Sequence, residues 1–244
     1  VMKEFIQNST FLGVVISLFA YWLGTFLKSK FKLAIFNPLL IAVILTVGAL
    51  CILKIDYSVY ESGTKYISYL LTPATVSLAI PLYEQLEVLK KNIRAILAGV
   101  TSGVIASLGT ILALAVVFRT SHEGYVTMLP KSITTAIGMG VSDELGGYVS
   151  ITVALIVITG ILGNVIAEPV LKLFRISEPV AKGISLGSAS HAIGTAKAME
   201  LGEVEGAMSS LSIVIAGILT VIGASIFAQF SQYAFPSIGK INML

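Results

Sequence analysis

Long apolar runs alternate with short polar segments along this chain. A helix that crosses a bilayer needs roughly 20 mostly apolar residues. Five runs approach or exceed this length: residues 11–27, 38–53, 95–118, 149–167 and 207–230. Small residues recur in them, and Gly99 and Gly103 stand at the GxxxG spacing that lets helices approach closely. The pattern predicts an all-α integral membrane protein.

Three further segments are apolar but interrupted: residues 66–83, 129–148 and 183–201. Pro73 and Pro81 stand inside the first of them, and a proline removes a backbone donor and clashes with the preceding helical turn. Irregular backbone at membrane depth is tolerated only where it is buried in protein or lines a wet cavity. We therefore expect all three segments inside the helix bundle, away from lipid.

The lysines and arginines orient the chain, because they are enriched in cytoplasmic loops. If the N-terminus is outside and residues 129–148 enter and leave on one side, ten of the sixteen Lys and Arg residues lie inside. If that segment crosses the membrane, only seven of them do. The distribution favours about seven transmembrane helices plus a re-entrant segment at residues 129–148.

An internal similarity links two of the apolar runs. The stretches "ILAGVTSGVIAS" (96–107) and "VIAGILTVIGAS" (214–225) share Ala, Gly, Ala and Ser at matching positions, and each follows an interrupted polar segment. This favours an inverted repeat, about 37–118 and 149–230, within one transmembrane domain spanning residues 1–244. In such repeats two discontinuous helices face each other near the midplane. Shared membrane-helix composition is the alternative explanation.

The stretch "SASHAIGTAKAMEL" (188–201) places ionisable side chains in one of the interrupted segments. An ionisable group at membrane depth is costly, although a histidine can stay neutral or titrate near neutral pH. His191 is therefore either a substrate ligand and proton carrier or a neutral histidine hydrogen-bonded between helices. Lys197 either neutralises a carboxylate or extends to the interface. Asn164 is a candidate for contact between helices, and Glu205 for a structural ion pair.

The interrupted segments are rich in hydroxyl groups, and two of them carry a cationic or protonatable side chain. Helix N-termini that open into a cavity attract anions as well. With no large apolar pocket indicated, this combination suits a small anion in a wet central cavity. The predicted substrate-binding residues are Thr72, Pro73, Thr75, Ser77, Lys131, Ser132, Thr134, Ser190, His191, Thr195 and Lys197. His191 is also the candidate for proton coupling.

The amino-acid composition supports a membrane protein and argues against several other classes of protein. The chain is 56% hydrophobic and 12% charged, whereas soluble domains are about 25% charged. A net charge of +3 does not suggest nucleic acid as a partner. With one cysteine, two histidines and no phosphate-binding or HExxH motif, we expect no metal or other cofactor. No nucleophile–base arrangement indicates an enzyme.

Four segments together resemble the LrgB/CidB family. They are "TPATVSLAIPLYEQLEVLKKN", "LPKSITTAIGMGVSDELGG", "TGILGNVIAEPVLKLFRI" and "SHAIGTAKAMELGEVEGAMSSL", and the resemblance covers residues 11–230. The resemblance implies a multi-pass protein of the bacterial cytoplasmic membrane, and it implies two competing functions. One is antiholin-like control of murein hydrolase activity and autolysis with a small LrgA/CidA-type membrane partner. The other is transport, since the plastidal glycolate/glycerate translocator has a similar domain and bacterial members are linked to pyruvate uptake.

Our interpretation from the sequence is a secondary transporter or facilitator of small monocarboxylates of the pyruvate, glycolate or glycerate type. It would work in the bilayer with the LrgA-type partner. The alternative is an antiholin-like regulator with no transport of its own. A homodimer is among the expected assemblies, because residues 11–27 and 38–53 form the most lipid-like runs and suit a fixed scaffold.

Overall fold

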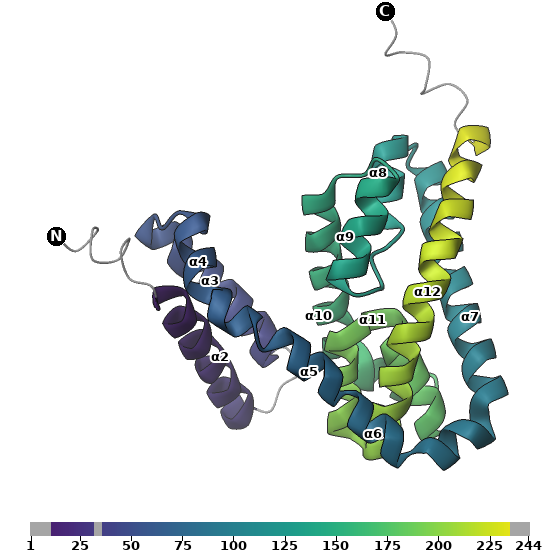
Figure 1. Ribbon diagram of the computed structural model, residues 1–244, viewed down its shortest axis with the longest axis horizontal. Coiled ribbons are helices and arrows are strands. Elements are labelled where there is room, and N and C mark those ends of the chain that lie inside the picture. The colour runs from purple at the N-terminus through teal and green to yellow at the C-terminus, as the bar shows by residue number, and fades with distance from the viewer. Residues whose placement is uncertain (1–10, 32–35, 235–244) are drawn as a thin grey trace, which may run out of the picture. The chain divides into compact units, whose positions relative to one another are not determined.

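The computed structural model describes residues 11–31 and 36–234, with side chains as far as residue 230 (Figure 1). Every regular element in this described part is an α-helix, which confirms the predicted fold class. Five stretches are long and apolar enough to cross a membrane: Leu12–Phe31, Tyr57–Glu84, Leu86–Val117, Val149–Leu173 and Glu203–Phe230. Pro38–Leu53 is apolar but shorter. The expected count of about seven crossings is therefore not confirmed.

The helices group into two compact units, divided between Ser77 and Leu78. In unit 1, α2 (Leu12–Phe31) packs against α3 (Pro38–Leu53) and α4 (Tyr57–Ser68). Gly13 and Gly24 leave no room for a Cβ against the backbone of the neighbouring helices. Glycines thus set the close helix packing here, as GxxxG-type contacts do in membranes.

The interruption predicted for residues 66–83 is present. The chain breaks between α4, α5 (Leu71–Ser77) and α6 (Ala79–Glu84), and Pro73 and Pro81 each fall in the first turn of a new helix, where a missing N–H is harmless. The expected burial of this segment is not found, because the side chains of α5 are exposed. The hydroxyls of Thr75 and Ser77 bond to carbonyls of their own helix, so α5 needs no polar partner elsewhere.

Unit 2 is built around three long helices, α7 (Leu86–Val117), α10 (Val149–Leu173) and α12 (Glu203–Ala234). The buried residues of α7 recur every three or four positions and so form one face of the helix. They are Ile96, Val100, Val104, Leu108, Ile111 and Ala115. This face packs on α12 and on the first arm of α11.

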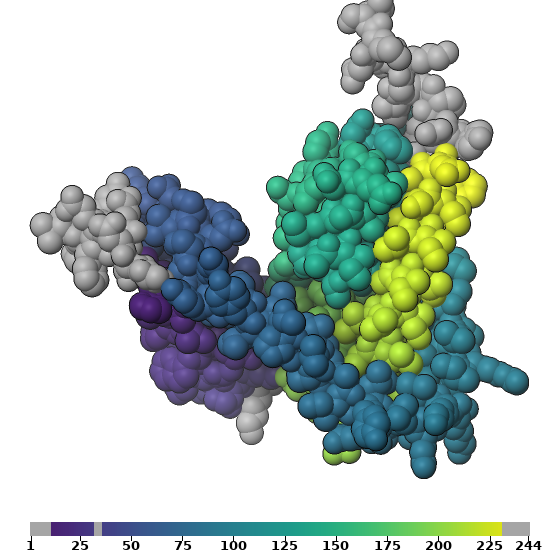
Figure 2. All heavy atoms as spheres, viewed as in Figure 1, coloured from purple at the N-terminus to yellow at the C-terminus, as the bar shows by residue number. Residues whose placement is uncertain are grey.

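Between α7 and α10 the chain enters unit 2 and turns back. It does so through α8 (His122–Met128) and α9 (Thr135–Glu144), whereas the re-entrant path across the membrane expected for residues 129–148 stays a prediction. Thr127 and Ser142 both hydrogen-bond Thr152 near the start of α10, whereas Gly138 meets Ile156 one turn further along. In Figure 2 the teal atoms of this α8–α9 hairpin lie against the yellow atoms of α12.

A second reversal lies in α11 (Pro179–Leu201), where the sequence predicted a discontinuous but crossing helix. Ser190 and His191 have non-helical backbone angles, and Gly194 lies directly against Leu186. Along α12, Gly183 and Gly187 of the first arm meet residues of increasing number. The second arm runs the other way, because Thr195 meets Ser209 and Met199 meets Gly206. This α11 hairpin therefore returns to the end of unit 2 at which it began.

The two hairpins enter unit 2 from opposite ends, as Figure 1 shows. Their inner ends meet the same helix, α7: Ser132 lies at Ser107, and Ser188 lies one turn away at Gly103. From residue 122 to residue 234, a hairpin followed by a long helix thus occurs twice, the second time with inverted direction. The inverted repeat expected at 37–118 and 149–230, and the single domain spanning 1–244, stay predictions.

Basic residues are unequally distributed between the two ends of unit 2. The end from which the α11 hairpin enters carries Lys90, Lys91, Arg94, Lys172, Arg175, Lys182 and Lys197. Among the described residues the opposite end has Arg119, and Lys131 lies at the tip of the α8–α9 hairpin. By the positive-inside rule we expect the first end to face the cytoplasm. Lys3, Lys32 and Lys240, which entered the sequence count, lie outside the described residues.

The reversal of α11 can be tested by cysteine accessibility in a Cys51→Ser background. Because the hairpin returns, Ser177→Cys before it and Glu203→Cys after it are expected to react with a membrane-impermeant thiol reagent from the cytoplasmic side. Arg119→Cys, at the other end of α7, should react from the opposite side. Labelling of the first two positions from opposite sides would show that α11 crosses the membrane.

Candidate functional site

The tip of the α11 hairpin is a strained and tightly held turn. His191 has φ 43° and ψ −138°, a region that costs a non-glycine residue on the order of 1–3 kcal/mol. Its Nε2 lies 3.0 Å from the carbonyl oxygen of Ile156 in α10, and the residue is only 4% exposed. Because a carbonyl only accepts, Nε2 donates this bond, and the neutral ring then presents Nδ1 as an acceptor. Gly160 leaves the space in which the ring lies.

The neighbouring hydroxyls divide into one that is bonded and one that is not. Thr195, fully buried, donates to the carbonyl of His191 at 3.1 Å and lies 2.7 Å from the hydroxyl of Ser209 in α12. Ser190 is 2% exposed and lies against Gly163 of α10, without a hydrogen bond from its hydroxyl to any other described residue. Thr195 thus fastens the second arm of the hairpin, whereas the hydroxyl of Ser190 is left available.

The tip of the α8–α9 hairpin carries an amine at depth. Lys131 Nζ donates to Ser132 Oγ at 3.0 Å, and Ser132 is in turn 3.4 Å from Ser107 Oγ on α7. No carboxylate among the described residues forms an ion pair with Lys131. Thr134 is the N-cap of α9 but its side chain makes no capping bond, so the first N–H groups of α9 lack that partner. An amine and free helix donors at one tip form a cationic, donor-rich surface.

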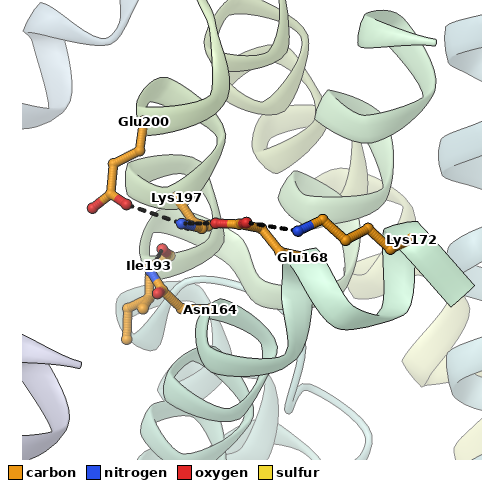
Figure 3. A network of polar contacts seen from close by, with 6 residues as sticks. All are labelled: Asn164, Glu168, Lys172, Ile193, Lys197 and Glu200. Atoms are coloured by element: carbon orange, nitrogen blue, oxygen red, sulfur yellow. Dashed lines mark hydrogen bonds and ion pairs between the residues drawn. The ribbon is translucent and has the colours of Figure 1, made fainter. Parts of the chain in front are cut away.

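An ionic network fastens the second arm of the α11 hairpin to α10 (Figure 3). Lys197 Nζ lies 2.7 Å from Glu168 Oε1 and 3.0 Å from Glu200 Oε2, and its side chain is 13% exposed. Glu168 also pairs with Lys172, at 3.7 Å. One turn deeper, Asn164 Nδ2 donates to the carbonyl of Ile193 at 3.0 Å, which confirms the predicted contact between helices.

The first arm of the same hairpin has an ion pair of its own. Lys182 Nζ lies 3.5 Å from Glu205 Oε1 at the start of α12, and Glu205 is buried. This confirms the structural ion pair considered for Glu205. Both arms of the hairpin are therefore tied to a neighbouring long helix by opposite charges.

The predicted site residues fall into four groups. Lys131, Ser132 and Thr134 lie at the α8–α9 tip, and Ser190, His191 and Thr195 at the α11 tip. Lys197 lies further along the second arm, held by carboxylates rather than extended to the interface. The remaining predicted residues are Thr72, Pro73, Thr75 and Ser77, which lie in α5 of unit 1 with exposed side chains. The substrate-binding role of all these residues stays a prediction.

Sequence reasoning missed Glu168 as the partner of Lys197. A signal for it exists in the sequence, because Asn164, Glu168 and Lys172 recur at four-residue spacing on an otherwise apolar helix. Residues at this spacing share one helix face. A polar stripe on a spanning helix indicates a polar partner helix, which here is the second arm of α11.

Fold and site together define a multi-pass α-helical membrane protein with two hairpins inserted from opposite ends into one unit. Residues 17–230 match the model of the LrgB-like family. Over 222 residues the chain is 36% identical to "Antiholin-like protein LrgB" of Bacillus subtilis (strain 168), covering 91% of this chain and 96% of that protein. It is equally similar, over 221 residues, to proteins of the same name from Bacillus mycoides (strain KBAB4) and Bacillus cereus (strain B4264), covering 90% of this chain and 96% of each.

The chain therefore belongs to the LrgB-like family and is a multi-pass bacterial membrane protein. No solved structure matches it.

A double-mutant cycle measures how firmly the ionic network holds the hairpin. We expect Lys197→Met and Glu168→Gln to show a coupling energy of about 0.5–1.5 kcal/mol in thermal unfolding, because Lys197 is mostly buried and its 2.7 Å contact with Glu168 is the shortest in the network. The matched control is Lys172→Met with the same Glu168→Gln. Lys172 is 81% exposed, so its coupling should be about 0–0.5 kcal/mol. Equal couplings would contradict the assignment of Lys197 as the fastening residue.

Proposed function

We propose that this protein acts as an antiholin-like protein of the bacterial cytoplasmic membrane. The supporting observation is the similarity to curated relatives of that name, which extends over about nine-tenths of the chain and nearly their full length. In this function the chain restrains murein hydrolase activity and autolysis together with a small LrgA/CidA-type membrane partner. It does so as a membrane component and not as an enzyme.

A second function, transport of small monocarboxylates of the pyruvate, glycolate or glycerate type, is favoured by the two opposed hairpins. Ile156 supports this reading, because its carbonyl binds His191 of one tip while its side chain meets Gly138 of the other hairpin. α9 and the second arm of α11 both begin at a tip, so their N-terminal N–H groups are directed into the interior of unit 2 from opposite sides. Half-helix N-termini directed in this way attract anionic groups of a substrate in transporters.

In the transport function, Lys131 supplies the positive charge for a carboxylate, and Ser132 and Thr134 supply donors beside it. Lys131 suits this role because it has no carboxylate partner among the described residues. His191 couples the step to protons by taking up a proton at Nδ1, since Nε2 is committed to Ile156. Lys197 contributes to anion binding only when its pairs with Glu168 and Glu200 open.

Uptake and autolysis measured on the same variants separate the two functions. Proteoliposomes with and without the LrgA-type partner are tested for saturable uptake of labelled pyruvate, glycolate and lactate. If the protein transports, Lys131→Gln should lower uptake roughly 10- to 100-fold, the loss expected for a hydrogen bond to a charged group. Lys65→Gln, which removes an exposed lysine of α4, is the control and should leave uptake unchanged.

Autolysis is then followed in a bacterial strain that lacks its own family member. An antiholin-like function predicts that the wild-type chain restrains autolysis. If Lys131→Gln restrains autolysis as well as the wild type, and no saturable uptake is found for either, the transport function is rejected. If Lys131→Gln loses both uptake and restraint of autolysis while the variant protein is present in the membrane at normal levels, both activities depend on the same site.

A further inference from the structure

An open cavity of about 490 Å³ lies at the cytoplasmic end of unit 2, where α10 ends and α11 begins and returns. Three cationic side chains, of Lys172, Arg175 and Lys182, line it together with one carboxylate, of Glu168. Cations therefore exceed acids in its wall by two. The cavity does not include the hairpin tips, so it is a separate site from the one discussed above.

The positive charge of this wall is only partly neutralised. Lys172 is 81% exposed and 3.7 Å from Glu168, a geometry in which an ion pair is weak. Lys182 pairs with Glu205 at 3.5 Å. Arg175 forms no ion pair with another described residue. Its guanidinium has five donors in a planar fork, which suits a phosphate oxyanion better than a lysine does.

The end of α10 does not repel an anion as an open helix C-terminus would. Arg175 has φ 55°, and its N–H donates to the carbonyl of Lys172, while the N–H of Ile176 donates to the carbonyl of Leu171. These two bonds satisfy carbonyls of the last turn. The negative end of the helix is thereby reduced, and the side-chain cations dominate the field in the cavity.

The position of the cavity indicates a ligand that belongs to the membrane. It opens at the end of a 25-residue helix that is long enough to span the bilayer, next to Leu173 and Phe174, which are 76% and 68% exposed. Exposed apolar side chains beside clustered cations are typical of the level at which acyl chains meet headgroups. Basic pockets between membrane helices on the cytoplasmic side bind anionic headgroups.

We propose that this cavity binds the phosphate group of an anionic phospholipid of the cytoplasmic leaflet, with Arg175 and Lys172 as the principal contacts. A soluble phosphate shares this chemistry, but the exposed apolar residues at the cavity rim favour the lipid. Binding draws Lys172 from Glu168, which leaves that carboxylate to Lys197 alone. The lipid thus tightens the attachment of the α11 hairpin to α10. This inference depends on neither of the two candidate functions.

The test compares thermal stability in nanodiscs of phosphatidylcholine alone and of phosphatidylcholine with phosphatidylglycerol. The wild-type chain is expected to unfold roughly 2–4 °C higher with the anionic lipid, the shift expected when about one lipid–cation contact is added to a chain of this size. Arg175→Gln should lose that shift while keeping its unfolding temperature in phosphatidylcholine, which shows that it folds. A third arm adds inorganic phosphate to phosphatidylcholine nanodiscs, where no shift is expected.

Arg119→Gln is the matched control. Arg119 also follows a long helix with positive φ, 50°, and its N–H and that of Thr120 close α7 as Arg175 and Ile176 close α10. It lines no part of the cavity. The proposal is overturned if Arg119→Gln and Arg175→Gln lose the lipid-dependent shift to the same extent, or if Arg175→Gln retains it. A shift produced by inorganic phosphate alone would overturn the lipid as the ligand.

Discussion

Inside a bilayer, a polypeptide can reverse direction only where its polar backbone finds partners in the protein, and both hairpins of unit 2 depend on this constraint. The α11 tip meets it with the bond between His191 and Ile156 and the bond from Thr195 to the carbonyl of His191. Glycines make these contacts possible, because Gly160 and Gly163 of α10 lie where a side chain would displace the tip. The opposed hairpins therefore depend on a closely fitting interior that also offers polar partners where the chain reverses.

The fold class and the interrupted segments could be predicted from the sequence. The direction in which the chain continues after an interruption could not. Pro73, Pro81 and the polar run around His191 correctly indicated interruptions, since proline position and polarity are local properties. Whether the interrupted α11 continues or returns depends on the backbone angles of two residues, Ser190 and His191, which the residue types do not determine. The reversal of α11 was missed for this reason. For residues 129–148 the re-entrant path favoured by the distribution of lysine and arginine stays a prediction.

For the candidate site as well, the sequence indicated individual polar residues but not how they are arranged in space. The sequence brought out His191, Thr195 and Lys131 because polar side chains are rare in apolar segments. It could not place Thr72 and Thr75 relative to them, and it assigned Lys197 no carboxylate partner, because Glu168 lies 29 residues earlier. Long-range pairs are found by geometry, whereas the polar stripe on α10 would have indicated only that a partner helix exists.

Ile156 has a consequence for how the two hairpins can move. Its carbonyl holds one tip and its side chain abuts the other hairpin, so the same turn of α10 serves as the abutment of both. A displacement of that turn would therefore act on both hairpins at once. The two hairpins are thereby coupled through a single turn of one helix.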